Sequence, residues 1–362
     1  MIEILTTGLP NTVQDLGRLG HLAMGVSHGG AMDKEALAIA NLMLGNDPSA
    51  AGIEVALHPF RLRAHVDTAV AITGADCAIS VGDRPCPPWW ATTIRAGETL
   101  ALEAPHLGAR SYIAFAGGLD LPPIMGSRAT DVKGNFGGLA GRGLSRGDRL
   151  ALKPAQGSLP AGGVGAALEE RRGATDGLAS AIGLRVLPAA EFDAFTPEAQ
   201  AAFIGSEWSI TNNANRMGYR LSGATLSLAS PLELLSHGIV PGTVQVPPSG
   251  QPIIQLADAN TCGGYPKIAT VIEADLWRLA QAPVGARLRF LPVSIGASTE
   301  ALRASQQRHH DFIAARDRMA GSALASLMKD LSRRRQLGPY PRVAKAPIRY
   351  PYSTRASEQA DP

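Results

Sequence analysis

The sequence predicts a mainly β protein with two domains, and three observations support this prediction. The chain has 362 residues, enough for two hydrophobic cores, and 45% of them are hydrophobic against 18% charged. Glycine (40 residues) and proline (26) are abundant while aromatic residues make up only 5%, which favours a turn-rich architecture over helical bundles. Short apolar runs of strand length, separated by these turn residues, recur in both halves of the chain.

The first half consists mostly of predicted strands interrupted by one helix. The strand-forming runs are 68–85, 98–105, 110–122 and 147–154. Asp33 is the predicted N-cap of the helix, because apolar residues follow it at helical spacing, at Leu37, Ala40 and Leu44. Gly45 is expected to end this helix.

The second half begins after a segment with the composition of a linker. We therefore predict a first domain over 1–155, a linker over 156–181 and a second domain over 182–293. Within the second domain, 183–211 indicates a strand, two short helices and a strand. Further strands are expected at 224–230, 242–248 and 251–258, and a helix over 272–282 precedes a last strand over 286–294.

The end of the chain differs from both domains. Residues 294–362 form a basic tail, predicted to be helical at first and then proline-rich and irregular. Acidic residues are interleaved with the basic ones and no nucleic-acid-reading motif is recognisable. The tail is therefore expected to be a solvated appendage or a subunit-docking arm, and no nucleic-acid partner is predicted.

Several classes of protein are disfavoured by composition. A net charge of +3 does not by itself indicate nucleic-acid binding. The three cysteines, Cys77, Cys86 and Cys262, are odd in number and widely spaced, which argues against a disulfide framework or a zinc site and favours a reducing cytoplasm. The first ten residues lack a secretory pattern, and no run of 18 apolar residues suggests a membrane span.

Two motifs have alternative interpretations. Gly25–Gly29 matches the Gly-x-Ser-x-Gly nucleophile elbow around Ser27, but the preceding apolar run is short and no alternating strands and helices surround it, which disfavours a serine hydrolase. The glycine-rich stretch Lys133–Asp148 could present backbone N–H groups to an anion, or could simply be a loop that needs positive φ angles. No Walker motif is present.

A third cluster of motifs lies in the second domain. Arg216 stands among short amides, Gln245 lies near the end of a predicted strand, and Asp258 begins a polar run that leads to a Gly-Gly-Tyr-Pro turn. Amides, one carboxylate and glycines at strand ends suit a small amide- or ureido-like ligand. The alternative is turn chemistry by the same residue types without any ligand.

Six of these motifs together resemble one family. They are TVQDLGRLGHLAMGVSHGGAMD, IANLMLGN, SRATDVKGNFGGLAGRGLSRGD, NRMGYRL, GTVQVPPSGQPI and ADANTCGGYPKIATV. In this order they resemble the KipA family, also known as allophanate hydrolase subunit 2, the C subunit of 5-oxoprolinase (PxpC) or the biotin-dependent carboxyltransferase family. The resemblance spans roughly residues 3–291 and leaves out the tail. It implies two cyclophilin-like β-barrel domains and a KipI-like partner, also known as allophanate hydrolase subunit 1.

The resemblance implies three functional alternatives. One is carboxyl transfer from carboxybiotin to a small amide nitrogen, as in urea carboxylase, with a biotin carboxylase or carrier as a further partner. Another is ATP-dependent opening of 5-oxoproline together with a LamB/YcsF-type subunit. The third is a non-catalytic regulatory protein that sequesters its KipI-like partner. No cofactor is expected to be bound permanently, because carboxybiotin would reside on a partner and ATP would act at the level of the complex.

The resemblance also suggests site residues. Arg216 and Gln245 are the expected hydrogen-bond donors, and Asp258 is the expected acceptor or base. Asp15 is expected to orient Arg18, and Arg18 to bind a carboxylate or carbonyl oxygen. This family usually has Gln where this chain has Asn260. No metal site is predicted, and the full set of expected substrate-binding residues is Gln14, Asp15, Arg18, Asp33, Arg128, Asn260, Thr261, Gly263, Gly264 and Tyr265.

Overall fold

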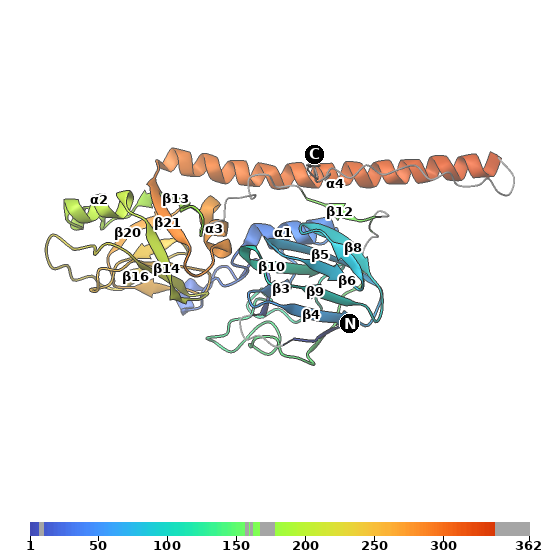
Figure 1. Ribbon diagram of the computed structural model, residues 1–362, viewed down its shortest axis with the longest axis horizontal. Helices are drawn as coiled ribbons and strands as arrows, with labels where there is room; N and C mark the ends of the chain where they lie inside the picture. Colours follow the sequence, from blue (N-terminus) through green and yellow to red (C-terminus); the bar gives the residue numbers. More distant parts are fainter. Residues whose placement is uncertain (7–10, 156–158, 160–161, 167–177, 337–362) are drawn as a thin grey trace, which may run out of the picture. The chain divides into compact units, whose positions relative to one another are not determined.

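The predicted mainly β class is confirmed. The computed structural model describes residues 1–6, 11–155, 159, 162–166 and 178–336, and the side chains among them up to residue 315. Contacts group Met1–Arg316 into one compact unit and Asp317–Pro362 into another. Within the first unit the strands form two large sheets and one closed barrel (Figure 1).

The N-terminal region is built from two six-stranded sheets. The first has the order β11-β1-β4-β9-β6-β7, and the second has the order β12-β8-β5-β10-β3-β2. The strands of the first sheet are β1 (Ile2–Ile4), β4 (Phe60–Ala64), β6 (Ile79–Val81), β7 (Arg84–Cys86), β9 (Thr99–Leu102) and β11 (Arg149–Leu150). The strands of the second are β2 (Thr12–Gln14), β3 (Gly52–Val55), β5 (Thr68–Asp76), β8 (Trp90–Ile94), β10 (Leu107–Phe115) and β12 (Val164–Gly165).

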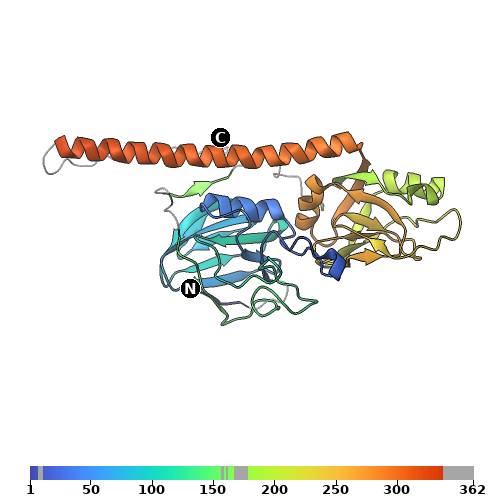
Figure 2. The same cartoon turned by 180° about the vertical axis from the view of Figure 1, so that it is seen from behind.

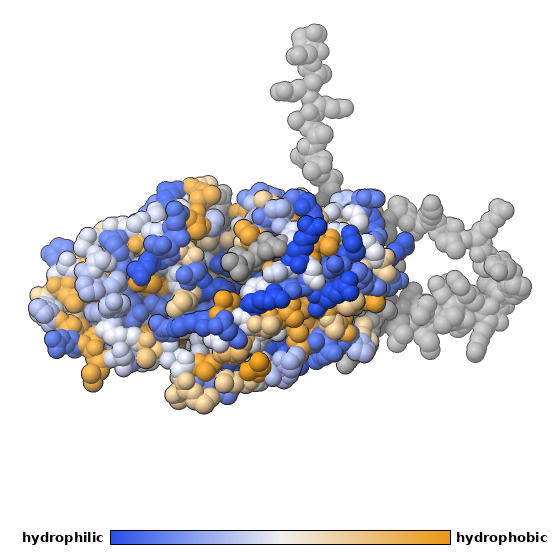
Figure 3. Space-filling model, turned by 90° about the horizontal axis from the view of Figure 1, so that it is seen from below, coloured by the Kyte–Doolittle hydropathy of each residue, from blue (hydrophilic) through white to orange (hydrophobic). Residues whose placement is uncertain are grey.

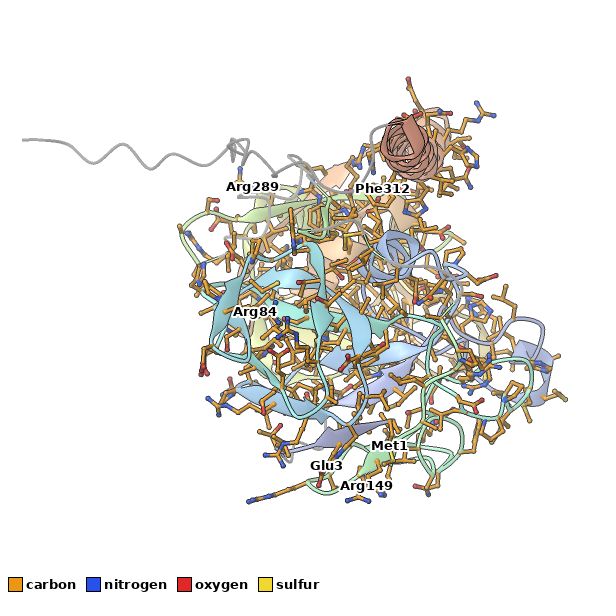
Figure 4. The ribbon with its side chains drawn as sticks, turned by 90° about the vertical axis from the view of Figure 1, so that its right-hand side faces the viewer. Met1, Glu3, Arg84, Arg149, Arg289 and Phe312 are labelled. Carbon is orange, nitrogen blue, oxygen red and sulfur yellow. The ribbon has the colours of Figure 1, made fainter. Side chains whose placement is uncertain are left out.

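One hydrophobic core lies between these two sheets. Strand β4 shows the pattern that produces it, because Phe60 and Leu62 are buried while Arg63 is exposed. Burying each such Phe or Leu contributes roughly 1.5–3 kcal/mol. At the edge of the first sheet, Glu3 of β1 is the register partner of Arg149 of β11, and the two are close together in Figure 4. Strand β12 comes from inside the predicted linker and pairs with β8.

Helix α1 (Lys34–Met43) covers the outer face of the second sheet, over β5 and β10 (Figure 2). It forms as the sequence predicts. The Asp33 carboxylate accepts a hydrogen bond from the Ala36 N–H at 3.0 Å, and Gly45 follows the helix with a φ of +73°. The helix is buried along most of its length, since it carries small and aliphatic residues on the face toward the sheet.

We expect Asp33→Ala to lower the free energy of unfolding by at least about 1–2 kcal/mol, because the cap bond to Ala36 is lost together with the acceptor of a buried hydrogen bond from Gln281. Urea unfolding of the full chain measures this effect. Asp33→Asn is the matched control, since its side-chain oxygen keeps the cap and the loss should be smaller. Equal urea midpoints for Asp33→Ala and the wild type would contradict the assigned role.

The C-terminal region contains a closed seven-stranded barrel in the order β13-β20-β17-β18-β15-β14-β21, closed by the parallel pair β21 and β13. Its strands are β13 (Ile182–Pro188), β14 (Trp208–Ala214), β15 (Gly218–Ser222), β17 (Thr243–Gln245), β18 (Ile253–Gln255), β20 (Lys267–Val271) and β21 (Arg287–Pro292). A separate two-stranded sheet joins β16 (His237–Gly238) to β19 (Cys262–Gly263). The short helices are η1 (Leu22–Met24), η3 (Phe192–Ala194), α2 (Pro197–Gly205), η4 (Glu273–Asp275) and α3 (Leu276–Gln281).

Helix α2 closes one side of the barrel through aromatic contacts. Phe203 of α2 stacks on Phe290 of β21 with ring centroids 4.3 Å apart, and Trp208 packs beside both. The predicted strand over 224–230 is wrong, since this segment makes only an isolated bridge between Leu228 and Phe195. Its apolar alternation instead places Leu226 and Leu228 against the barrel core.

The N-terminal sheets and the barrel are joined by a buried polar connection. The Gln281 side chain, at the end of α3, donates to the Asp33 carboxylate at 2.9 Å and accepts from the Arg110 N–H at 3.1 Å. The Arg110 guanidinium in turn donates to the Tyr219 hydroxyl at 2.8 Å. Because these groups are buried and hydrogen-bonded to one another, they fix the orientation of the two regions.

The predicted helical start of the tail is confirmed by α4 (Ile295–Gln336). Phe312 of this helix packs against the apolar cluster formed by α1 and the second sheet, and Figure 4 labels it. The predicted proline-rich end and most of the predicted linker lie outside the described residues. On the face in Figure 3, apolar residues are scattered among hydrophilic ones.

Candidate functional site

Arg216 connects the barrel to the N-terminal sheets. It lies at the tip of the β14–β15 hairpin, where the Asn215 side chain accepts the Met217 N–H at 2.8 Å and so holds the turn. Its guanidinium makes a bidentate pair with Asp258, at 2.8 and 2.9 Å. The Asp258 N–H also donates to the Arg216 carbonyl at 2.9 Å, so side chains and backbone hold these two loops together.

The remaining guanidinium donors of Arg216 reach the N-terminal region. One donates to the Glu54 carboxylate at 2.6 Å, and another donates to the Gly30 carbonyl at 2.7 Å. Burial alone would lower the pKa of Arg216, but the carboxylates of Asp258 and Glu54 raise it well above its usual value. Arg216 is therefore a permanently charged centre between two carboxylates.

Glu54 is a fully buried carboxylate on β3. It accepts hydrogen bonds from the Met32 N–H at 2.8 Å and from the Tyr112 hydroxyl at 2.9 Å, and Arg110 lies 3.9 Å away. Burial alone would raise the pKa of Glu54, but Arg216 and Arg110 hold it below its usual value of 4.5. The charge of Glu54 thus depends on the arginines around it.

We expect Glu54→Gln to lower the free energy of unfolding by about 3 kcal/mol at pH 7, because it leaves buried arginines uncompensated. Since the folded pKa is lowered, the stabilisation by Glu54 is fully present above about pH 4.5 and is lost as the pH falls through the folded pKa. The difference in unfolding free energy between Glu54→Gln and the wild type should therefore shrink below pH 4, as measured by urea unfolding. Glu207→Gln, at an exposed pair with Arg287, should show almost no such difference.

Arg18 is a second cation near Arg216, and its hydrogen-bond partners differ from those of Arg216. Its side chain is only 1% exposed, it lies over the Phe136 ring at 4.7 Å, and one terminal nitrogen donates to the Ala129 carbonyl at 2.7 Å. The other two nitrogens, Nε and Nη1, have no hydrogen-bond partner among the residues that the structure describes. Burial lowers the pKa of Arg18, although nearby carboxylates including Asp258 oppose this effect.

Gly29 lies between Arg18 and Asp258. A Cβ atom at this position would be 3.5 Å from Arg18 Nη1 and 3.7 Å from Asp258 Oδ1. Its φ of +58° and its N–H donation to the Ala257 carbonyl at 3.0 Å fix the loop against the barrel. The missing side chain therefore leaves a small space beside the unpartnered nitrogen of Arg18 and the carboxylate of Asp258.

Asp15 holds the loop that carries Arg18. Its carboxylate accepts from the Gly17 N–H at 2.8 Å, the Ser127 hydroxyl at 2.6 Å and the Arg128 N–H at 2.5 Å. The expected direct bond to Arg18 is replaced by these three, so Asp15 positions the backbone on either side of the site. The Arg128 guanidinium turns away and donates from Nε to the Leu121 carbonyl at 2.7 Å.

Two other predicted N-terminal residues have structural partners. Gln14 is buried and donates to the Thr12 hydroxyl at 2.9 Å, while its Oε1 has no partner in the described part of the chain. Asp33 caps α1 and accepts from Gln281, as described above. Both side chains are therefore held by other residues of the chain, and substrate contact by either remains a prediction.

Asn260, Thr261 and Gln245 have hydrogen-bond partners other than Arg216. Asn260 accepts from the Lys133 ammonium at 2.6 Å, and Thr261 accepts the Ile239 N–H through its carbonyl at 3.1 Å. Gln245 lies with Gly263 and Lys267 at the end of the barrel. In this second group, Gly264 follows β19 and Tyr265 is exposed.

The sequence reasoning missed several residues that form this framework: Glu54, Arg110, Tyr112, Lys267 and Gln281. One local signal could have indicated Glu54, namely a charged residue inside the otherwise apolar run Gly52–Val55. The described residues contain no group of three or more His, Cys, Asp or Glu that could hold a metal ion. Among those residues there is also no helix with the length and apolar character needed to cross a membrane.

Comparison with known proteins gives a consistent result. Residues 24–292 match the family described as "Carboxyltransferase domain, subdomain A and B". The chain is 43% identical over 315 residues to the C subunit of 5-oxoprolinase from Escherichia coli K12, covering 87% of this chain and 98% of that protein. It is 31% identical to urea amidolyase of Lachancea kluyveri, covering 91% of this chain but 18% of that protein.

The fold agrees with these similarities. The crystal structure of urea amidolyase from Kluyveromyces lactis superposes with a TM-score of 0.76 at 27% sequence identity. The match covers 86% of this chain and 20% of that protein, so this chain spans about a fifth of the length of the yeast enzyme.

Proposed function

The chain belongs to the carboxyltransferase-domain family, subdomains A and B, and we propose that it is a component of a 5-oxoprolinase-type enzyme complex. Within that complex, its role is to bind the carboxylate or carbonyl oxygens of a small lactam or amide. Relatives named as the C subunit of 5-oxoprolinase, at 40% and 43% identity, are covered almost completely by this chain, which supports this complex first. The urea amidolyases share less identity over a small part of their length, so carboxyl transfer to an amide nitrogen is the second candidate.

The observation that carries the proposal is the buried Arg18 guanidinium, of which two nitrogens find no partner among the described residues. A buried cation without compensating acceptors is unfavourable unless a ligand supplies them. A lactam amino acid such as 5-oxoproline has a carboxylate and a ring carbonyl, and either can accept from an arginine. A donor placed in a buried site also stabilises negative charge that develops on such an oxygen during reaction.

Asp258 has a narrower role in this proposal than the sequence suggested. Both of its oxygens accept hydrogen bonds from Arg216, so the carboxylate is held in place. We assign Asp258 to orienting either the N–H group of the substrate or the guanidinium of Arg18. Proton abstraction by Asp258 would require the Arg216 pair to open, and the direct test is the pH dependence of turnover in Asp258→Asn.

The partners in the proposal are a KipI-like protein and a LamB/YcsF-type protein, in a cytoplasmic complex that agrees with three unpaired cysteines. The chain has no Walker motif, so we place ATP on a partner. For the second candidate the carboxyl group would arrive on carboxybiotin of a biotin carrier. In both cases the residues of this chain bind and orient the substrate, while ATP or the carboxyl group is held by a partner protein.

Reconstitution tests the proposal. The purified chain is combined with the KipI-like and LamB/YcsF-type proteins encoded in its own source, and ATP hydrolysis is followed with and without 5-oxoproline. Hydrolysis that requires 5-oxoproline and all three proteins is the expected result. Turnover that instead requires a biotin carboxylase, bicarbonate and an amide would establish the second candidate. Tight binding to the KipI-like protein with no turnover in either mixture would contradict both and favour a regulatory protein.

We expect Gly29→Ala to reduce the turnover of the reconstituted complex about tenfold, because its methyl group would lie 3.5 Å from Arg18 Nη1 and 3.7 Å from Asp258 Oδ1 and take up the space beside both. Gly45→Ala is a matched control. Gly45 also has a positive φ, but nothing lies within 4 Å of its added Cβ and it is at the end of α1. The two variants should be similarly destabilised, by about 1–2 kcal/mol. Equal loss of turnover in both would show that backbone strain alone causes the effect.

A further inference from the structure

A second polar group lies at one end of the closed barrel. Gln245 of β17 and Lys267 of β20 are register partners on adjacent antiparallel strands, so their side chains leave the sheet on the same face. Gly263 of β19 lies against them, because a Cβ on this glycine would be 2.6 Å from Gln245 Nε2. His237 of β16 pairs with Gly263 and completes the group.

The ammonium group of Lys267 is buried without a paired carboxylate. Lys267 is 7% exposed, and its Nζ atom makes only long contacts, to the Gly263 carbonyl at 3.2 Å, the Tyr265 carbonyl at 3.4 Å and His237 Nδ1 at 3.5 Å. Across the part of the chain that the structure describes, Lys267 forms no salt bridge. The nearby Glu191 carboxylate accepts the backbone N–H of Lys267 at 3.0 Å instead. Burial accordingly lowers the pKa of Lys267, against the opposing charge of Glu191.

Gln245 adds an independent observation. Its side chain is 4% exposed, its Oε1 accepts from Gln255 Nε2 at 2.9 Å, and its own Nε2 has no hydrogen-bond partner within the described ranges. The bond from Gln255 fixes the direction of the Gln245 amide, so that the unpartnered nitrogen points toward Gly263. A buried N–H group without an acceptor is rare in proteins and often marks a ligand position.

From these observations we propose that Lys267 and Gln245 form a second ligand site in this chain, which binds a carboxylate and is separate from the site at Arg18. One carboxylate oxygen accepts from the Lys267 ammonium and the other from the Gln245 amide. This pairing compensates the buried charge and satisfies the unpartnered donor. The site does not depend on the activity proposed above, and its test uses no turnover.

The surroundings favour a carboxylate over a phosphate. The carbonyls of Gly263 and Tyr265 and the carboxylate of Glu191 already make this end of the barrel rich in acceptors. A phosphate carries about two charges and needs more donors than one ammonium and one amide supply. A carboxylate carries a single charge on two oxygens, which matches the two donors.

Acetate is the probe for the test. The full chain is labelled with ¹³C at lysine Cε, and the six lysines of the sequence are followed by NMR as sodium acetate replaces sodium chloride at constant ionic strength. The Lys267 signal, identified by its loss in Lys267→Met, should shift and saturate. Lys153→Met is the matched control and should leave that shift unchanged. A Lys267 signal that does not respond to acetate would overturn the proposal, without reference to any variant that fails to fold.

Two further variants separate this site from the first. Gln245→Met should weaken acetate binding at Lys267 about tenfold, because one of the two donors is removed. Arg18→Met should leave the Lys267 shift intact. A shift that disappears in Arg18→Met would mean that acetate binds only at Arg18, and the second site would then be rejected. Unchanged affinity in Gln245→Met would likewise exclude the two-donor arrangement.

Discussion

Arg18→Met should reduce turnover of the reconstituted complex about 100-fold or more while leaving the chain folded, because a buried donor to the reacting oxygens is removed. The stability should stay within about 1 kcal/mol of the wild type or exceed it. The variant loses one hydrogen bond to Ala129 but no longer buries a guanidinium with two unpartnered nitrogens. A residue that lowers stability and supports turnover is expected at a binding site rather than in a structural core.

Two measurements check this prediction. Urea unfolding gives the stability, and ATP hydrolysis that depends on 5-oxoproline gives the turnover. Arg142→Met is the matched control, since Arg142 makes an exposed ion pair with Asp148 at 2.7 Å and should be neutral in both assays. Arg18→Lys should recover only part of the activity, because an ammonium lacks the planar fork of donors. A strongly destabilised Arg18→Met would instead indicate a structural role.

Arg216→Met should have the largest effect on stability, a loss of about 3–5 kcal/mol. Truncation leaves Glu54, which is fully buried, and Asp258 without their shared cation. It also removes the bond to the Gly30 carbonyl that links the barrel to the N-terminal loop. Turnover should be lost as well, because Asp258 and the Gly30 carbonyl lose the Arg216 hydrogen bonds that hold Asp258 and the Gly29–Gly30 loop in place.

Urea unfolding at pH 7 measures the stability of Arg216→Met. Arg287→Met is the control, because Arg287 pairs with the exposed Glu207 and its loss should amount to less than about 1 kcal/mol. The double variant Glu54→Gln with Arg216→Met should be more stable than the sum of the single effects, since the two residues compensate each other. Additive losses would show that the two side chains act independently.

The proposed carboxylate site at Lys267 and Gln245 provides a readout that does not depend on turnover. Acetate binding at Lys267 reports on the barrel end even in variants whose turnover is lost. Arg18→Met and Lys267→Met together therefore distinguish the failure of the proposed activity from the failure of the second site.

The sequence by itself determined the features that depend on local patterns. Glycine, proline and short apolar runs indicated the β class, and Asp33 was recognisable as an N-cap because capping involves only the next few residues. Asp258 and Arg216 were each identifiable as site candidates through the family motifs, and the structure joins them directly. The wrong strand over 224–230 shows the limit of this reasoning, because alternation reports burial and not pairing.

Only the tertiary structure decided how these residues are charged and satisfied. Glu54 and Arg216 are 162 positions apart, and no local pattern links a carboxylate in β3 to a hairpin tip in the barrel. Gln245, expected as a hydrogen-bond donor together with Arg216, is the register partner of Lys267, and only the pairing of β17 with β20 shows this. Whether a cation is paired depends on which carboxylates the fold brings within hydrogen-bond distance. That is why the unpartnered nitrogens of Arg18 could be recognised only once the chain was seen folded.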